Sequence, residues 1–300
     1  MKSPANPVDV ASHHAPDWIT FAPATFVILW STGFIGMRLG APHAEPFTFM
    51  ALRMAIVVAI LLVAAWVFRA PWPTNRTTIM HAVIAGLLVH ATYLSGVLYA
   101  ISMQLPLGFI ALIAGLQPIL SALISRLVLG ERLSNIQWLG MLLGLVGVML
   151  VAASKFTAGE VQASALVAAV VALLGITLGT LYQKRYCTAM DLRTGGVIQF
   201  SATGVVLFVF ALLFESRVVD WTPQFGFALG WLAIVLSLGA ISLLYVMIRH
   251  GATSKVASLF FLTPSVTAVM AYLLFGESLA PLAVAGLLVS AIGVAMVTRD

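Results

Sequence analysis

A few polar side chains interrupt the long apolar stretches of this chain, and these are the groups with which it could bind a polar solute. Arg53 is the one formally charged residue well inside such a stretch, and its guanidinium could hold a carboxylate through two parallel hydrogen bonds. It could equally extend to the end of its helix or bond a carbonyl of a neighbouring helix. His90, at the centre of another stretch, is either a titrating or hydrogen-bonding group of a pathway or a satisfied interior histidine.

Two prolines inside apolar stretches, in the pairs Gln117–Pro118 and Thr263–Pro264, form the strongest mechanistic pair. Each proline removes one hydrogen bond within its helix, so we expect kinks at Pro118 and Pro264, with Gln117 and Thr263 beside freed backbone groups. In transport proteins such broken helices bind polar ligands and act as hinges. Kinks that serve only to shape a helix are the alternative.

Aromatic side chains complete the set of candidate binding residues. Tyr99 and Tyr245 occupy equivalent positions of an internal repeat, which gives both of them weight. Trp30 and Tyr182 could line a cavity, although aromatic side chains in membrane helices more often contact lipid or other helices. The predicted substrate-binding residues are Trp30, Arg53, His90, Tyr99, Gln117, Tyr182, Tyr245 and Thr263.

The internal repeat has an offset of 146 residues and covers the chain without a gap. It places Tyr99 on Tyr245 and Pro118 on Pro264. One structural unit is therefore written twice, and a repeat of this kind decides the architecture.

The repeat is clearest in two hairpins, Gly130–Glu131 and Gly276–Glu277, each of which joins two apolar runs. Gly130 can adopt the left-handed conformation that ends a helix, and the segment Ser134–Gln137 has the spacing of a capping box for the next helix. The glutamates can accept the amides of a helix start. We interpret both hairpins as turns at the membrane surface in preference to proton carriers.

The amino-acid composition indicates that these residues lie in a membrane protein. The chain is 61% hydrophobic and 8% charged, whereas a soluble domain carries about 25% charged residues. Its 300 residues leave room for ten membrane helices of about 20 residues each and for no sizeable soluble domain. The predicted spans are 19–38, 47–69, 79–101, 107–129, 135–154, 162–183, 195–215, 225–248, 252–275 and 281–298.

Five spans per repeat is an odd number, so the second copy must enter the membrane from the opposite side, as an inverted repeat. With the amino terminus in the cytoplasm, eleven basic residues fall in inside segments and three in outside loops. This bias predicts that both termini are cytoplasmic. We expect a disordered tail at 1–18, without a cleavable signal peptide, followed by one five-helix repeat at 19–155 and a second at 156–300.

Several function classes are disfavoured. Cys187 is the only cysteine, which excludes an intramolecular disulfide and a thiolate metal cluster. The adjacent pair His13–His14 in the polar tail lacks the three or four ligands of a metal site. The fifteen basic residues are scattered over helix ends, which argues against nucleic acid as a partner. We therefore predict no metal, no cofactor, no enzyme activity and no nucleic acid, with a small-molecule substrate and the lipid bilayer as partners.

Small residues line one side of two equivalent spans. Gly140, Gly144 and Gly147 occur in the fifth span, and Gly286 and Gly293 occupy matching places in the tenth. Such residues let helix backbones approach closely. Packing within the bundle is the favoured interpretation and dimerisation through this face is the alternative, so we expect a monomer or a weak dimer.

These motifs together resemble the EamA-type unit of the drug/metabolite transporter superfamily. The resemblance rests on Gly130–Leu133, Trp138–Gly140, Gly147–Val148, Trp30–Phe34, Ala51–Arg53 and Gln117–Pro118. Within the superfamily the chain is most similar to the YddG-type amino-acid exporters. The resemblance implies a ten-helix carrier that moves small polar metabolites by alternating access through a central cavity. The second copy departs from the pattern, because Ile176–Thr180 replaces Trp30–Phe34 and Gln199 stands in the place of Arg53.

The function predicted is export of small metabolites, amino acids including aromatic ones among them, across the bacterial inner membrane. No Asp or Glu lies at mid-span, which favours facilitated diffusion or exchange and leaves His90 as the one evident route to proton coupling. A drug or nucleotide-sugar exporter is the alternative, although it would need a larger or more cationic cavity. An integral membrane enzyme is a remote alternative, because the acids lie at helix ends and no His-x-x-x-His motif occurs.

Overall fold

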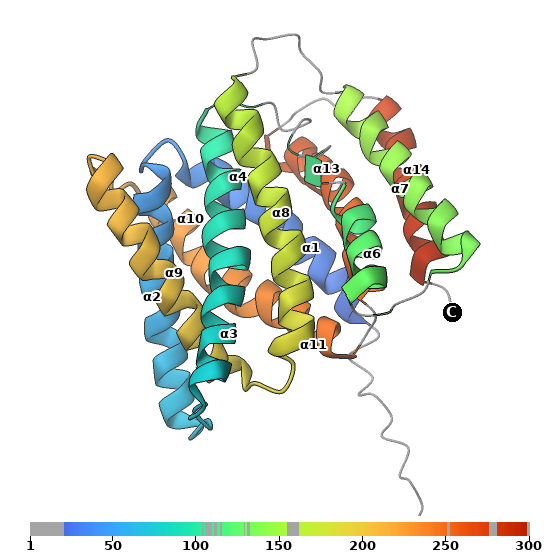
Figure 1. The fold of residues 1–300 in the computed structure, drawn as a ribbon. Helices are drawn as coiled ribbons and strands as arrows, with labels where there is room; N and C mark the ends of the chain where they lie inside the picture. The colour runs from blue at the N-terminus through green and yellow to red at the C-terminus, as the bar shows by residue number, and fades with distance from the viewer. Residues whose placement is uncertain are drawn as a thin grey trace, which may run out of the picture.

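The structure is a computed structural model that describes most of the chain as a bundle of helices (Figure 1). The described residues are 21–103, 105, 110, 113–114, 116–128, 130, 133–154, 162–250, 253–275 and 281–298. The predicted tail at 1–18 and three hairpin residues, Glu131, Gly276 and Glu277, lie outside them.

The helices follow one another as the hydropathy pattern predicts. In chain order they are α1 (Ala22–Gly40), α2 (Pro46–Val67), α3 (Arg76–Gly86), η2 (Leu87–Thr92), α4 (Tyr93–Ser102), α6 (Gln117–Val128), α7 (Asn135–Ser154), α8 (Ala163–Tyr186), α9 (Leu192–Phe214), α10 (Pro223–Trp231), η3 (Leu232–Ala240), α11 (Ile241–His250), α12 (Thr253–Ser258), η4 (Leu259–Phe261), α13 (Thr263–Phe275) and α14 (Pro281–Thr298). The bounds of the predicted spans agree with these helices to within three residues, except that the span at 107–129 is described as a helix only in part.

The prediction of an all-helical membrane protein is confirmed for the described residues. Seven helical segments there are long and apolar enough to cross a membrane, and α7 and α14 contain shorter apolar windows. The one β contact described is an isolated bridge between Ala44 and Val219 in two loops.

Two of the spans are continuous helices with a wider π-helical turn in the middle. The first runs through α3, η2 and α4, and the second through α10, η3 and α11. The repeat offset carries η2 (87–92) onto 233–238, which lies inside η3 (232–240). Both copies of the repeat therefore contain a π-helical turn at the equivalent position. Such π-helical turns are frequent at functional sites, and the hydropathy pattern gave no sign of them.

The proline-containing spans are interrupted where the sequence predicts. Pro118 is the second residue of α6, which follows a turn at Leu116, and Pro264 is the second residue of α13, which follows a turn at Leu262. Before Leu262 the helix narrows into the single 3₁₀ turn η4. The breaks are thus present, and their use as hinges stays a prediction.

The first hairpin has the predicted mechanics. Gly130 has a φ of 72°, the left-handed conformation in which glycine carries no steric penalty. Ser134 and Gln137 form the capping box: the Ser134 amide donates to Gln137 Oε1 at 3.0 Å, and the Gln137 amide donates to Ser134 Oγ at 3.3 Å. A capped turn of this type fixes the angle at which α7 leaves the hairpin.

The small-residue stripe packs α7 against α14, which lie side by side at one edge of the bundle (Figure 1). A Cβ atom on Gly147 would lie 2.5 Å from the carbonyl oxygen of Gly286, and one on Gly293 would lie 2.5 Å from that of Gly140. Ser290 also donates to the Gly144 carbonyl at 3.3 Å. This face is therefore used within the chain, as the packing interpretation predicts.

Replacing Gly147 by Ala tests this contact. The added methyl group would meet backbone atoms that cannot move aside, so we expect Gly147→Ala to destabilise the protein by about 1–3 kcal/mol. Gly226 in α10 has nothing within 4 Å of a built Cβ, so Gly226→Ala is the matched control and should be neutral or slightly stabilising. Thermal unfolding in detergent measures both; equal melting temperatures would show that α7 and α14 do not pack this closely.

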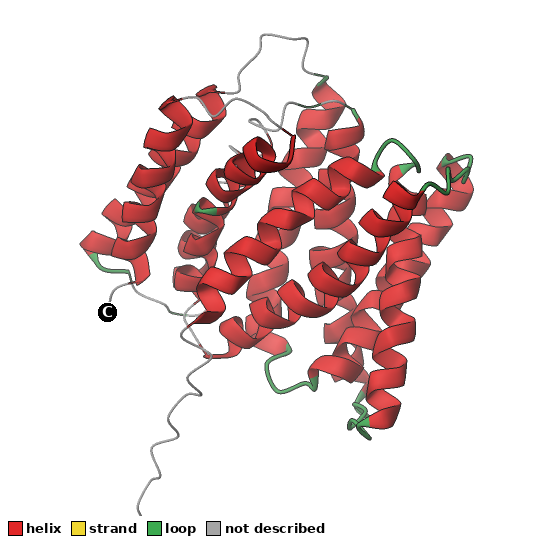
Figure 2. Ribbon diagram, turned by 180° about the vertical axis from the view of Figure 1, so that it is seen from behind, coloured by secondary structure: helices red, strands yellow, loops and turns green. Residues whose placement is uncertain are grey.

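Two loops meet at one end of the bundle, the α1–α2 loop and the α9–α10 loop (Figure 2). Glu215, at the end of α9, caps the start of α2: its carboxylate accepts hydrogen bonds of 2.7 Å from the amides of Phe47 and Thr48 and from the Thr48 hydroxyl. A carboxylate at this place satisfies amides that have no partner inside the helix and interacts favourably with the helix dipole.

Glu45 makes the reciprocal contact. Its carboxylate accepts from the amide and hydroxyl of Ser216, at 2.8 and 2.7 Å, and from the amide of Arg217 at 3.1 Å. These hydrogen bonds, that of the Ser216 hydroxyl above all, hold the pKa of Glu45 below its usual value. Glu45 and Glu215 together form a clamp that ties the start of α2 to the end of α9.

The clamp predicts a specific pH dependence. Because the pKa of Glu45 is lower in the folded protein than in the unfolded chain, its stabilisation is present above pH 4.5, the ordinary value, and is lost as the pH falls below it. The melting temperature of the wild type should therefore fall more between pH 6 and acid pH than that of Glu45→Gln. Parallel pH profiles for the two proteins would contradict the clamp.

Candidate functional site

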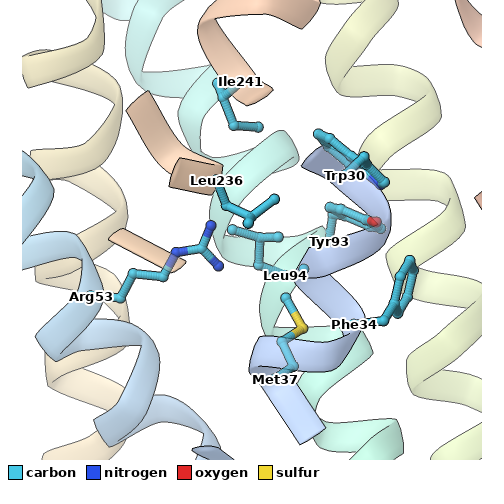
Figure 3. A pocket seen from close by; sticks show the side chains of 9 residues that line it. Trp30, Phe34, Met37, Arg53, Tyr93, Leu94, Leu236 and Ile241 are labelled. Atoms are coloured by element: carbon cyan, nitrogen blue, oxygen red, sulfur yellow. The ribbon is translucent and has the colours of Figure 1, made fainter. Parts of the chain in front are cut away.

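A small cavity lies between the first spans of the chain and the π-helical segment η3 (Figure 3). Its volume is about 20 Å³, enough for one water molecule. The residues that line it are Trp30, Gly33, Phe34, Met37, Arg53, Tyr93, Leu94, Leu236 and Ile241. They come from α1, α2, α4, η3 and α11, so helices from both halves of the sequence build one site.

Arg53 provides the charge of this cavity, and its guanidinium points toward Leu236 and Leu94 in Figure 3. The side chain is 1% exposed, so it does not extend to the membrane surface, which was one of its two alternatives. Its Nε donates to the Ser237 hydroxyl at 3.0 Å, and its Nη1 lies 3.9 Å from the sulfur of Met50. Ser237 thus takes the place of the carbonyl that the sequence suggested.

The guanidinium keeps unused hydrogen-bonding capacity. It has five N–H donors, and among the described residues only Ser237 and Met50 accept from it. No carboxylate in the described part of the chain forms an ion pair with Arg53. A buried charge without a partner is costly, so a site of this kind favours an anionic group from outside the protein.

Aromatic rings form the wall opposite Arg53. Trp30 is 4% exposed and stacks on Tyr93, with ring centroids 6.0 Å apart and planes at 17°. Its other neighbours are Phe260 at 5.1 Å, in an edge-to-face contact, and Phe26 at 5.1 Å. The cavity therefore combines a positive charge on one side with an apolar aromatic surface on the other.

A second buried polar group lies deeper in the bundle and is a chain of hydrogen bonds. The Tyr245 hydroxyl donates to Gln199 Oε1 at 2.8 Å and lies 3.4 Å from His90 Nε2. Gln199 then donates to Gln183 Oε1 at 3.1 Å. These four residues are at most 5% exposed and come from α11, α9, η2 and α8. Two of the predicted site residues, His90 and Tyr245, are thus brought together.

His90 has a defined orientation in this chain. Its ring stacks on Phe200, with centroids 4.1 Å apart and planes at 21°. Its Nδ1 is buried and has no partner among the described residues. His90 is therefore held on one side and unpartnered on the other, which matches neither a fully satisfied interior histidine nor a solvated one.

The two polar groups are unequal copies of one repeat position. Gln199 stands where the offset of 146 residues carries Arg53. Arg53 bonds one hydroxyl and faces a cavity, whereas Gln199 bonds both Tyr245 and Gln183. One half therefore offers a free cationic donor and the other a closed neutral network.

The remaining predicted site residues do not line the cavity. Tyr182 is only partly buried, its hydroxyl lies 2.7 Å from His81 Nδ1, and it is not among the residues that line the cavity. Tyr99 is also partly buried. Gln117 and Thr263 are buried, at 2% and 3% exposure, as the first residues of α6 and α13.

Sequence reasoning missed Ser237 and Gln183. Serine is common in membrane helices, where its hydroxyl usually bonds a carbonyl of its own helix, and Ser237 also donates to the Leu232 carbonyl at 3.2 Å. Its second role as an acceptor for Arg53 depends on which helix lies opposite. Gln183 stood at the predicted end of a span, where a polar side chain gives no signal of burial.

The hydrogen-bond chain predicts a measurable cost for losing the Tyr245 hydroxyl. In Tyr245→Phe, the Gln199 carbonyl and His90 Nε2 lose a partner inside the bundle, so we expect a loss of about 1–3 kcal/mol of stability. Tyr272→Phe is the control, because Tyr272 is 49% exposed. Thermal unfolding of both variants measures the difference; an unchanged melting temperature for Tyr245→Phe would show that water replaces the hydroxyl at no cost.

A bundle of apolar helices that encloses a charge, an aromatic wall and a small cavity is the architecture of a polytopic membrane transport protein. The profile of the EamA-like transporter family matches residues 18–153 and again residues 163–299. The chain therefore belongs to the EamA-like transporter family, within the drug/metabolite transporter superfamily.

Relatives of the chain are named as transporters or as a probable efflux pump, which supports the same class of protein. The chain is 25% identical over 282 residues to the uncharacterized transporter YvbV of Bacillus subtilis, a match that covers 91% of this chain and 89% of the relative. It is 24% identical to the uncharacterized inner membrane transporter YedA of Escherichia coli, over 90% of this chain and 87% of the relative. A protein of Salmonella typhimurium named as a probable amino-acid metabolite efflux pump is 22% identical, with 89% and 90% covered.

The fold is also found among solved structures. One crystal structure superposes with a TM-score of 0.76 and covers 95% of this chain and 97% of its own, at 21% sequence identity. Similarity at this level of identity establishes the fold alone.

Proposed function

We propose that this protein is a secondary transporter that exports small metabolites, amino acids including aromatic ones among them, as a facilitator or exchanger. We further propose ten membrane helices in two inverted five-helix repeats, residues 19–155 and 156–300, with both termini in the cytoplasm. The separate family matches to 18–153 and 163–299 support the division into two halves. The Salmonella relative, named as a probable amino-acid metabolite efflux pump, supports the solute class.

The observation that carries the proposal is the buried Arg53 guanidinium beside an aromatic wall. A zwitterionic amino acid needs donors for its carboxylate and a surface for its side chain. Arg53 supplies charged donors without a competing carboxylate among the described residues. Trp30 and Tyr93 supply the apolar surface, which favours bulky or aromatic side chains. A solute of this class is also what the resemblance to the YddG-type amino-acid exporters implies.

Binding requires the cavity to widen. A volume of about 20 Å³ holds a single water molecule and no amino acid. In alternating access, one half of the bundle rocks against the other and opens the central site to each side in turn. The helix breaks before Pro118 and Pro264 lie at equivalent positions of the two halves and suit hinges for this movement.

Transport in proteoliposomes tests both solute and site. Counterflow with labelled amino acids, nucleosides and sugars should show exchange of bulky apolar amino acids and not of their amides, which lack the carboxylate. Arg53→Gln should lower amino-acid counterflow by roughly 10- to 100-fold, the loss expected for a charge-assisted hydrogen bond. Arg53→Lys should retain part of it, since an ammonium keeps the charge and loses the planar pair of donors.

Arg76→Gln is the matched control for the same experiment, because Arg76 is exposed at the start of α3. It should transport as the wild type does. Exchange of nucleosides or sugars without any amino acid would favour the alternative of a drug or nucleotide-sugar exporter. Full activity of Arg53→Gln would show that the guanidinium does not bind the solute.

Coupling is the second property that the proposal specifies. No Asp or Glu lies inside the described helices away from their ends, so a carboxylate-based proton relay has no residue there to use. His90 is then the group on which proton coupling would depend. We expect an imposed pH gradient to drive no accumulation of amino acid into liposomes. Accumulation that persists in His90→Gln would contradict both the absence of proton coupling and the dependence of any coupling on His90.

A further inference from the structure

Buried hydroxyl groups without partners are concentrated on α6 and α13. On other described helices most buried hydroxyls bond a carbonyl, for example Ser31 to Val27 at 2.7 Å and Thr177 to Leu173 at 2.7 Å. This is the ordinary way in which serine and threonine are satisfied in membrane helices. Ser95 on α4 is an exception, without a partner among the described residues. The described side chains on α6 and α13 that have a buried polar atom without a partner are Gln117, Ser121, Ser125, Thr263, Ser265 and Thr267.

The three residues on α6 form a continuous polar face. Gln117, Ser121 and Ser125 follow each other at intervals of four residues, which places them on one side of the helix. They are 2%, 0% and 0% exposed, and the face extends over roughly 12 Å of helix. Because α6 packs against α8, α12 and η4, the polar face points into the bundle and not toward lipid.

The repeat contains the same arrangement at equivalent positions. The offset of 146 residues carries Gln117 onto Thr263 and Ser121 onto Thr267, and each of these four residues has a buried polar atom without a partner. An unmade hydrogen bond in an apolar bundle is unfavourable. Its occurrence at matched positions of both halves indicates a property of the fold and not a local packing fault.

The helix α6 packs against η4, which also contacts the aromatic wall of the Arg53 cavity. Trp30, in that wall, contacts Phe260 at 5.1 Å, and Phe260 belongs to η4, which packs against α6. Next to Trp30, the Ser31 hydroxyl lies 3.3 Å from the carbonyl oxygen of Thr263. The aromatic group therefore contacts the charged cavity on one side and the η4 turn, a neighbour of α6, on the other.

We propose that the Gln117–Ser121–Ser125 face is a second, uncharged subsite that binds the ammonium group of a zwitterionic solute on its way between Arg53 and the end of the membrane where α6 ends. The unpartnered hydroxyl oxygens of Ser121 and Ser125 can accept hydrogen bonds from an ammonium group and rotate to follow it, whereas the unpartnered Nε2 of Gln117 is a donor and can bond the carboxylate of the same zwitterion. With no carboxylate on this face, the cation is held weakly enough to leave. The proposal deepens the proposed function, since it assumes a zwitterionic solute.

Cysteine accessibility tests the subsite without any transport measurement. Cys187 is the only native cysteine. It is buried, and burial raises the pKa of its thiol to about 11. Cys187→Ser removes this thiol and gives a background without reactive cysteine. In that background Ser121→Cys and Ser125→Cys are treated in membrane vesicles with a cationic thiosulfonate, the ethyltrimethylammonium reagent, and with its anionic sulfonatoethyl counterpart. We expect both cysteines to react about tenfold faster with the cationic reagent, as a path for ammonium requires.

Two neighbours on α6 are the controls. Ala122 is 1% exposed and packs in the apolar core, and Leu123 is 47% exposed on the outer surface of the bundle. Neither Ala122→Cys nor Leu123→Cys should react with these membrane-impermeant reagents. Labelling of Ser121→Cys and Ser125→Cys no faster than Ala122→Cys, in protein that is monodisperse in detergent, would assign the hydroxyls to packing and overturn the proposal.

The outcome separates this proposal from the proposed function. If amino acids exchange but the cysteines do not react, the transporter uses another route and the subsite is wrong. If the cysteines react preferentially with the cation but no amino acid exchanges, the polar path exists and carries another cationic solute. That result contradicts the zwitterionic solute of the proposed function and leaves the polar path in place. A double variant, Ser121→Ala with Ser125→Ala, should lower counterflow at least tenfold while the melting temperature stays unchanged or rises, since removing unpartnered buried hydroxyls relieves a cost.

Discussion

The hydrogen bond between Arg53 and Ser237 is the contact on which the arrangement of the central site depends. It links α2 to the π-helical segment η3, which belongs to the other half of the chain. A guanidinium inside an apolar bundle is stable only with acceptors around it, and one hydroxyl and one thioether leave it under-satisfied. The remaining free energy is available to a carboxylate that enters the cavity. In the proposed function, the incomplete set of partners around this one side chain is what binds the anionic group of the solute.

The rest of the bundle holds this side chain in place. Glu215 caps the start of α2 less than two turns before Arg53, so the helix that carries the guanidinium begins at a fixed point. On the opposite side, Trp30 is fixed between Tyr93 and Phe260. The site is therefore preorganised by the cap at the start of α2 and by ring packing inside the bundle. Widening it requires whole helices to move together with these groups.

How much of this could be read from the sequence depends on the range of the interaction. Helix bounds, the breaks at Pro118 and Pro264 and the left-handed Gly130 follow from local composition and backbone sterics, and the structure has them. The importance of Arg53 also follows, because a charge inside an apolar stretch is conspicuous.

Contacts between helices could not be predicted in the same way. Tyr182 was predicted to line the cavity, yet it lies beside His81, because the direction of its side chain depends on how α3 packs on α8. The acceptor Ser237 and the clamp of Glu45 and Glu215 depend on partners more than 160 residues away. The π-helical turns depend on backbone hydrogen bonding that the apolar pattern does not encode.

The claim that the Arg53 guanidinium takes its missing partner from the solute can be measured most directly by ligand-induced stabilisation of the purified protein. A ligand that binds the folded state alone raises the melting temperature, and the rise grows with the ratio of ligand concentration to dissociation constant. The account predicts that a bulky apolar amino acid stabilises the wild-type protein, whereas its amide, identical in shape but without the carboxylate charge, does not. Equal stabilisation by the acid and the amide would contradict it.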